Sequence, residues 1–293
     1  MTECVLNDQR GAARARILLL VMTVLIAAFS VVDYLYSDKF NDQSTIFSLA
    51  YGDHPLAKAW YDLFGTFWQR LVGVGSIVVL FALREKGEAL LIFYAYGSVQ
   101  VICSITRLLY HDLRPCHFNP ELALRACMCS FGKISRSTTN ATAMYLIFGA
   151  VISARLPPAL RWPLRVVAVA VPLNIGLVRF LLARHSWNQI VIAWLWGAWI
   201  FAVFWLLRAT RSEALAAFLQ REEHAEAAKR RFHGLFFAFF LAINVLCLGL
   251  WYRGSVWEAG LKMANTVCFE SCERGPAFIR REMQALGARN WGL

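Results

Sequence analysis

Long apolar stretches constrain this sequence more than any other feature. Seven of them approach the length of a membrane span, at 17–36, 65–83, 88–110, 138–155, 162–182, 187–208 and 233–252. About 20 apolar residues cross a bilayer as a helix, and a backbone inside lipid must satisfy its own hydrogen bonds. The sequence therefore predicts an all-α, polytopic membrane helical bundle of about seven transmembrane helices, with a membrane domain over 1–252. The first apolar run lacks a small-residue cleavage site, so we expect it to remain as a membrane anchor.

The basic residues flank the predicted spans. The net charge is +11, but no single basic stripe marks a nucleic-acid surface, so we expect no nucleic-acid partner. With seven spans, the basic segments 1–16, 84–86, 155–165 and 208–231 share one side, which the positive-inside rule assigns to the cytoplasm or its equivalent, such as the mitochondrial matrix. We expect an integral protein of an organellar membrane, such as the mitochondrial inner membrane, or of an endomembrane.

Two polar motifs fall near the loop 111–137 on the opposite side. In the first, Arg107 lies seven residues before Arg114. That spacing is nearly two helical turns, so both arginines point the same way until Pro115 ends the helix. The second motif is Ile134-Ser135-Arg136-Ser137, which lies just before the fourth span.

A third motif lies between the fifth and sixth spans, on the same side as the other two. Arg179 precedes His185, and Gln189 follows the histidine by four residues. His185 and Gln189 therefore share one face at the start of a helix, where N–H groups and positive potential favour an anion. The three motifs together predict a phosphate site on the non-cytoplasmic side.

These motifs resemble those of the type 2 phosphatidic acid phosphatase superfamily, which includes lipid phosphate phosphatases and glucose-6-phosphatase. Family members carry Lys-x6-Arg-Pro, then Pro-Ser-Gly-His, then Ser-Arg-x5-His-x3-Asp. The resemblance covers roughly 60–210 and implies a six-helix phosphatase-like core. It implies that His185 is the nucleophile, which forms a phosphohistidine, and that Gln189 occupies the position of the residue that orients it. It also implies binding of phosphate or a lipid headgroup by a set of five residues, Arg107, Arg114, Ser135, Arg136 and Arg179.

The sequence departs from this family pattern at three positions. Ser137 stands where the family has its general-acid histidine, and serine cannot protonate a leaving group near neutral pH. General acid catalysis contributes roughly 10²–10⁴-fold. Gln189 replaces an aspartate and cannot stabilise a developing imidazolium with negative charge. Arg136 replaces a glycine, which places a long side chain where the backbone approaches phosphate and where it can plug the site.

These departures predict a catalytically degenerate protein that binds membrane phospholipids or serves as a structural subunit of a larger membrane assembly. The alternative is an active lipid phosphatase or phosphotransferase that uses His185. In that case the acid comes from elsewhere, and the candidates are His111, Asp112 and His117. A seven-helix receptor fits the predicted orientation and the phosphate motifs less well.

The remaining predictions concern the segments beyond the core. The segment 209–232 is either an interfacial helix on the cytoplasmic surface or a continuation of the sixth span. The seventh span and the extramembrane tail 253–293 exceed a six-helix core and predict contacts with other subunits. We expect disulfides among the non-cytoplasmic cysteines and no cofactor or metal, a four-cysteine zinc site being the less favoured alternative. Those cysteines are Cys116, Cys127, Cys129, Cys268 and Cys272.

Overall fold

A computed structural model describes residues 2–51, 86–109, 114–115 and 134–219, together with the single positions 55, 59 and 75. These residues form helices and no strand, which confirms the all-α class. The helices are α1 (Thr2–Tyr51), α4 (Lys86–Leu109), α6 (Arg136–Ser153), α7 (Pro158–Leu181) and α8 (Trp187–Leu219). The predicted spans at 65–83 and 233–252 and the tail 253–293 lie outside the described residues.

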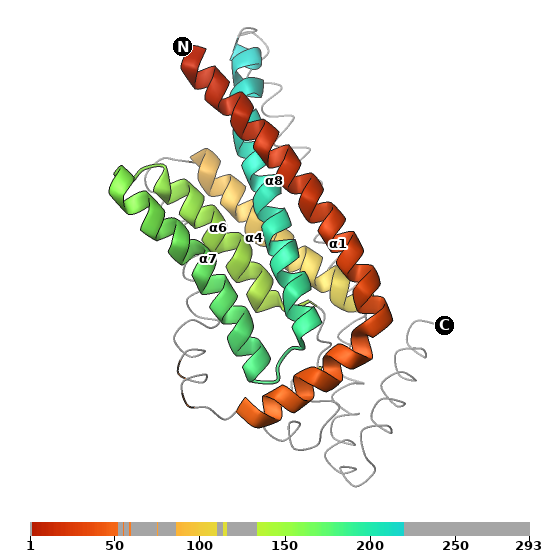
Figure 1. Ribbon diagram of the computed structural model, residues 1–293. Coiled ribbons are helices and arrows are strands. Elements are labelled where there is room, and N and C mark those ends of the chain that lie inside the picture. Colours follow the sequence, from red (N-terminus) through yellow and green to blue (C-terminus); the bar gives the residue numbers. More distant parts are fainter. Residues whose placement is uncertain are drawn as a thin grey trace.

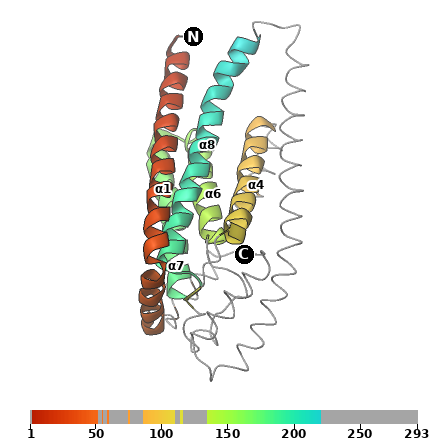
Figure 2. The ribbon, with the colours of Figure 1, turned by 90° about the vertical axis from the view of Figure 1, so that its right-hand side faces the viewer.

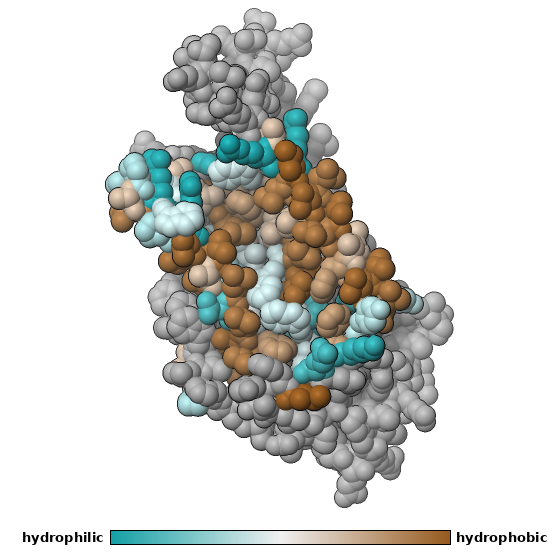
Figure 3. All heavy atoms as spheres, in the orientation of Figure 1, coloured by the Kyte–Doolittle hydropathy of each residue, from teal (hydrophilic) through white to brown (hydrophobic). Residues whose placement is uncertain are grey.

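Three of the described helical segments are long and apolar enough to cross a membrane, Gly11–Tyr36, Pro158–Leu181 and Trp187–Thr210. A shorter apolar stretch, Leu91–Cys103, lies in α4. Apolar side chains cover most of the described surface in Figure 3, and hydrophilic ones gather at its upper end. Large exposed side chains of α1 and α7, among them Leu20 and Trp162, belong to this apolar surface, as expected of helices that face lipid.

Helix α1 is longer than the sequence analysis predicts. The first predicted span ends at residue 36, but the helix continues to Tyr51. No glycine or proline occurs between 37 and 51, so nothing in this polar stretch interrupts the helix. Figure 1 shows that α1 bends and that its last part lies across one end of the bundle.

Helices α1, α4 and α7 run towards one end of the bundle, and α6 and α8 run away from it. In Figures 1 and 2, the end of α4, the start of α6, the end of α7 and the start of α8 all lie at one end, which we call the site end. The start of α1, the turn between α6 and α7, and the last part of α8 lie at the other end. The basic residues Arg155, Arg161 and Arg208 belong to this other end, as the sequence predicts.

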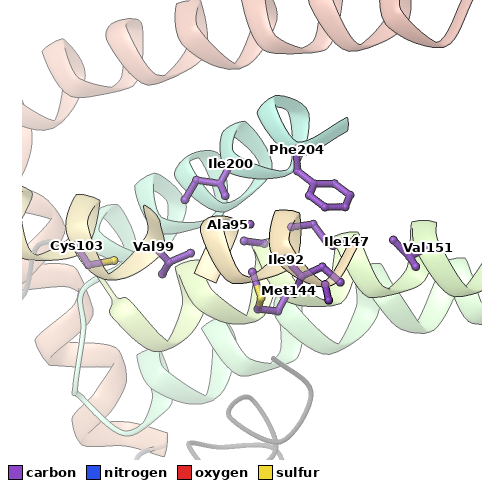
Figure 4. Close-up of a cluster of buried hydrophobic side chains, with 11 residues drawn as sticks. Ile92, Ala95, Val99, Cys103, Met144, Ile147, Val151, Ile200 and Phe204 are labelled. Carbon is purple, nitrogen blue, oxygen red and sulfur yellow. The ribbon is translucent and has the colours of Figure 1, made fainter. Parts of the chain in front are cut away.

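The apolar core lies between α4, α6 and α8 (Figure 4). Ile92 and Val99 of α4 pack there against Met144 and Ile147 of α6, and Phe204 of α8 closes the cluster. Cys103 of α4 is also buried in this cluster. The core fixes the spacing of the helices whose ends meet at the site end.

Glycines allow the helices to approach closely. A Cβ added at Gly197 of α8 would lie 2.5 Å from the Thr142 Cβ of α6, and one at Gly149 would lie 2.5 Å from the Ala168 Cβ of α7. Small residues at such contacts are the usual means by which membrane helices pack. Any larger side chain at these positions has to push two helices apart.

Helix α8 extends past the predicted sixth span to Leu219. The first part of the segment 209–232 therefore continues that helix, which was one of the two alternatives. Residues 220–232 lie outside the described residues. An interhelical hydrogen bond ties α8 to α1 within the spans, because the Trp199 Nε1–H donates to Thr23 Oγ1 at 3.0 Å.

Candidate phosphate site

The structure brings most of the predicted site residues together at the site end. Arg114, Arg179 and His185 are 1%, 4% and 3% exposed, and Ser135 and Gln189 are fully buried. Ser137 is half-buried, and Arg136, the first residue of α6, is exposed. Because its side chain is exposed, Arg136 does not fill the site as the sequence analysis envisaged. Arg107 lies in the last turn of α4, and its side chain is not among those described.

The turn before His185 is a helix C-cap with left-handed backbone. The Ala183 N–H donates to the Phe180 carbonyl at 3.0 Å, and the Arg184 N–H donates to the Arg179 carbonyl at 3.1 Å. This pair of bonds is the Schellman motif, which ends a helix and reverses the chain. Its C′ residue is Ala183, with φ of 54°, a conformation that costs an L residue about 1–2 kcal/mol.

Helix α8 begins with one of the two bonds of a capping box. The Ile190 N–H donates to the Ser186 carbonyl at 3.2 Å, so Ser186 is the N-cap. Gln189, three residues on, accepts the Ser186 N–H with its Oε1 at 3.3 Å. The bent end of α1 caps a further donor, because the Trp187 N–H donates to Ser44 Oγ at 3.1 Å. These bonds fix Gln189 beside His185.

Hydrogen bonds define the protonation of His185. Its Nδ1 lies 3.2 Å from Gln189 Oε1, and its Nε2 lies 3.3 Å from Arg114 Nη1. A guanidinium only donates, so Nε2 is the acceptor and carries a lone pair. The amide oxygen only accepts, so the proton is on Nδ1. His185 is therefore neutral, with its Nε2 lone pair directed toward a buried cation.

The two buried arginines come from different parts of the chain, Arg114 from a position after the end of α4 and Arg179 from α7. Arg114 also donates from Nη1 to the Arg184 carbonyl at 2.5 Å, which holds it against the turn that carries His185. Arg179, in the last turn of α7, donates from Nη2 to Ser137 Oγ at 2.6 Å. The guanidinium of Arg179 thus binds the residue at the general-acid position.

Ser135 joins the start of α6 to the start of α8. Its N–H donates to the Gln189 carbonyl at 3.4 Å. Its hydroxyl lies 2.9 Å from Thr138 Oγ1, and its carbonyl accepts the Thr139 N–H at 2.9 Å. The backbone of Ser135 therefore positions the start of α6 against Gln189. Its side chain bonds to Thr138 of α6.

A buried carboxylate beside the site was missed by the sequence analysis. Asp33 of α1 is 0% exposed, and its Oδ1 accepts the Asn188 Nδ2–H at 2.5 Å. Asn188 in turn accepts the Ser186 hydroxyl with its Oδ1. One signal was available in the sequence, because an ionisable residue inside a predicted span is a functional candidate by default.

Several predicted contributors lie outside the described residues. They are the candidate acids His111, Asp112 and His117, and the cysteines Cys116, Cys127, Cys129, Cys268 and Cys272. Among the described residues, no cluster of histidine, cysteine or carboxylate side chains has the arrangement of a metal site.

Comparisons with known proteins identify similar sequences and folds. A sequence model of the PAP2 superfamily matches residues 88–213, the range that holds Arg107, Arg114, Arg179 and His185. The solved structure of a protein described as the first transmembrane PAP2-type phosphatidylglycerolphosphate phosphatase from Bacillus subtilis is similar, with a TM-score of 0.55 and 15% identity. The match covers 64% of this chain and 93% of that one. No curated protein sequence matches this chain.

Proposed function

Since this chain is a membrane protein of the PAP2 superfamily, we propose that it binds the phosphate of a lipid headgroup and hydrolyses it at no more than background rate. The observation that carries this proposal is the convergence of Arg114, Arg179 and neutral His185 at the start of α8. Two segments distant in sequence supply these groups, one that holds Arg114 and one that holds both Arg179 and His185, so the arrangement depends on the fold of the bundle.

The charge balance supports binding of an anion. Arg114 and Arg179 are buried at the end of a membrane bundle, where a cation has a high desolvation cost that a bound anion offsets. Guanidinium groups match phosphate oxygens in geometry and charge. The N-terminal end of α8 adds positive potential at the same place. A phosphate monoester, which carries up to two negative charges, fits this site better than a phosphodiester.

The residue at the general-acid position supports the loss of catalysis. Ser137 accepts a hydrogen bond from Arg179 at 2.6 Å, and a hydroxyl held in this way is neither an acid nor a base near neutral pH. A leaving alkoxide would depart without a proton, which lowers the rate by roughly 10²–10⁴-fold. Gln189 adds to the loss because its amide cannot balance a charged imidazole.

A second candidate function, phosphotransfer through His185, is favoured by one specific observation. The Nε2 lone pair points away from the Gln189 side, and the Nδ1 proton is held by an amide oxygen. An attack by Nε2 forms an N–P bond and breaks the P–O bond to the leaving group. Without an acid, the leaving group departs as an anion, so this activity is limited to esters of acidic alcohols or phenols.

One experiment separates the two candidates. The purified protein is incubated with phosphatidic acid, an alkyl ester, and with p-nitrophenyl phosphate, whose leaving group needs no proton. We expect phosphate release from phosphatidic acid to equal that of His185→Ala. Release from p-nitrophenyl phosphate that disappears in His185→Ala supports phosphotransfer. His185-dependent release from phosphatidic acid contradicts the degenerate site.

We further propose that this protein is a subunit of a membrane assembly. The proposal rests on sequence, because the seventh span, the basic segment 208–231 and the tail 253–293 exceed the six-helix core. A specific interface buries at least about 1,000 Å², and segments of this length can supply that area. The test is migration on mild-detergent native gels. A full-length protein that migrates as a monomer contradicts the proposal, and a complex that survives deletion of 253–293 shows that the tail is not the contact.

The orientation of the site is also a proposal. The turn between α6 and α7 and the last part of α8 lie at the end of the bundle opposite the start of α8. These segments carry Arg155, Arg161 and Arg208, so we infer from the positive-inside rule that the site faces the non-cytoplasmic side. Single cysteines introduced at exposed positions of each end test this orientation, through labelling by an impermeant maleimide in intact organelles or cells. Labelling of the Arg161 end from outside contradicts it.

A further inference from the structure

Asp33 introduces a negative charge into the site from outside the three motifs. It is the only carboxylate among the buried side chains that the structure describes, and Arg114 and Arg179 are buried at the same end. A carboxylate inside a membrane helix has a high desolvation cost and is retained where it has partners. One partner of Asp33 is Asn188, in the first turn of α8.

A continuous chain of hydrogen bonds leads from this carboxylate to His185. Asp33 accepts from Asn188, and Asn188 accepts from the Ser186 hydroxyl. The Ser186 N–H donates to Gln189 Oε1, which also lies 3.2 Å from His185 Nδ1. The first turn of α8 is thus held from one side by Asp33, while its other side orients the imidazole.

The site has a neutral amide where a charge would act most directly. Gln189 Oε1 contacts His185 but carries no formal charge. The carboxylate of Asp33 binds instead to Asn188, the residue that precedes Gln189. A negative charge within the first turn of a helix interacts favourably with the helix dipole and with nearby arginines. Asp33 belongs to α1, but its bond to Asn188 places its carboxylate at the first turn of α8.

We propose that Asp33 is a positioning residue of the phosphate site, and that it supplies from α1 the negative charge of the His185–Gln189 turn. This inference rests on the proposed function for the role of His185. It makes α1 part of the site, in addition to the motifs on α4, α6, α7 and α8. The first turn of α8 accommodates one negative charge. A carboxylate at position 189 is therefore unfavourable while Asp33 is present, and it becomes favourable when Asp33 is replaced by a neutral residue.

A double-mutant cycle tests this charge relationship. The variants are Asp33→Asn, which keeps an acceptor for Asn188 but removes the charge, Gln189→Asp, and the two combined. The readout is the thermal unfolding midpoint of the full-length protein in detergent, without added phosphate. We expect the double variant to unfold about 3 °C or more above the value obtained by adding the two single shifts.

A matched control uses the same pair of helices. Thr23→Val removes the acceptor of the Trp199 indole between α1 and α8 but changes no charge, so its effect should add to that of Gln189→Asp. Additive shifts for Asp33→Asn with Gln189→Asp overturn the proposal and leave Asp33 a structural residue. If Asp33→Asn alone does not purify, recovery of folded protein in the double variant supports the proposal, and failure of both overturns it.

Inorganic phosphate titrated into the wild-type protein keeps the two proposals distinguishable. Absence of phosphate binding together with a compensating double variant refutes the proposed function and sustains the role of Asp33. Phosphate binding together with additive shifts sustains the proposed function and refutes the role of Asp33.

Discussion

Gly197 is one of the described positions where an added methyl group should disturb the bundle strongly. A Cβ there would lie 2.5 Å from Thr142 Cβ and 2.9 Å from the Thr139 carbonyl oxygen. Non-bonded carbon atoms prefer about 3.5–4.0 Å, so α6 and α8 must separate by about 1 Å. A backbone oxygen cannot rotate away, unlike the end of a side chain. The helices must therefore move.

The magnitude follows from two opposing contributions. Overpacking of this kind costs typically about 1–3 kcal/mol, and the close backbone contact places Gly197→Ala near the upper end. The higher helix propensity of alanine stabilises the folded protein by about 1 kcal/mol. The net loss is about 2 kcal/mol, which lowers the unfolding midpoint by about 4–8 °C in a chain of this size.

The assay is thermal unfolding of the purified protein in detergent, with Gly11→Ala as the matched control. A Cβ at Gly11 of α1 meets only Ala209 Cβ, at 4.0 Å, an ordinary contact. That substitution should leave the midpoint unchanged or raise it, because only the gain in helix propensity remains. A Gly197→Ala protein as stable as Gly11→Ala would refute the close approach of α6 and α8.

Three further predictions use the same protein. Arg114→Gln should lower phosphate affinity about tenfold or more, because a buried charge-assisted contact is lost, whereas Arg136→Gln at an exposed position should change it less than threefold by calorimetry. Trp199→Phe removes the 3.0 Å bond to Thr23 and should lower stability by about 0.6 kcal/mol in a denaturant titration; no change would indicate that the indole finds another acceptor. Ala183→Val places a β-branched residue at φ of 54° and should lower the unfolding midpoint by at least about 2 °C, whereas Ala183→Gly should change it little.

The placement of the site could be predicted from the sequence because two patterns agree. The basic flanks of the spans assign the two sides of the membrane, and the three motifs fall on the side that lacks those flanks. In the structure Arg114 Nη1 lies 3.3 Å from His185 Nε2, and Arg179 bonds to Ser137 in the first turn of α6. The capping box was also visible, since Ser186 precedes Gln189 by three residues.

The contribution of α1 could not be predicted from the same patterns. The stretch 37–51 is polar, and polarity alone does not distinguish a loop from a helix that leaves the membrane. Asp33 and Asn188 are 155 residues apart in sequence, and their contact depends on how α1 crosses α8. A lone sequence carries no periodicity that reports such a crossing.

The position of Arg136 illustrates the same limit. The substitution of arginine for glycine predicts a side chain that fills the site, yet the first residue of α6 directs it to an exposed position. Side-chain direction at a helix start depends on the orientation of that helix against its neighbours, which only the three-dimensional structure supplies.

The central claim, binding of a lipid phosphate monoester without hydrolysis, is tested most directly in nanodiscs that contain either phosphatidic acid or phosphatidylglycerol. Both lipids are anionic, but only the first presents a monoester. We predict that phosphatidic acid raises the unfolding midpoint by about 5 °C or more, as expected for a ligand near 100 times its Kd. We also predict that Arg114→Gln loses this shift and that no phosphate is released above the level of His185→Ala. Equal midpoints in the two lipids, or phosphate release that requires His185, would contradict the account.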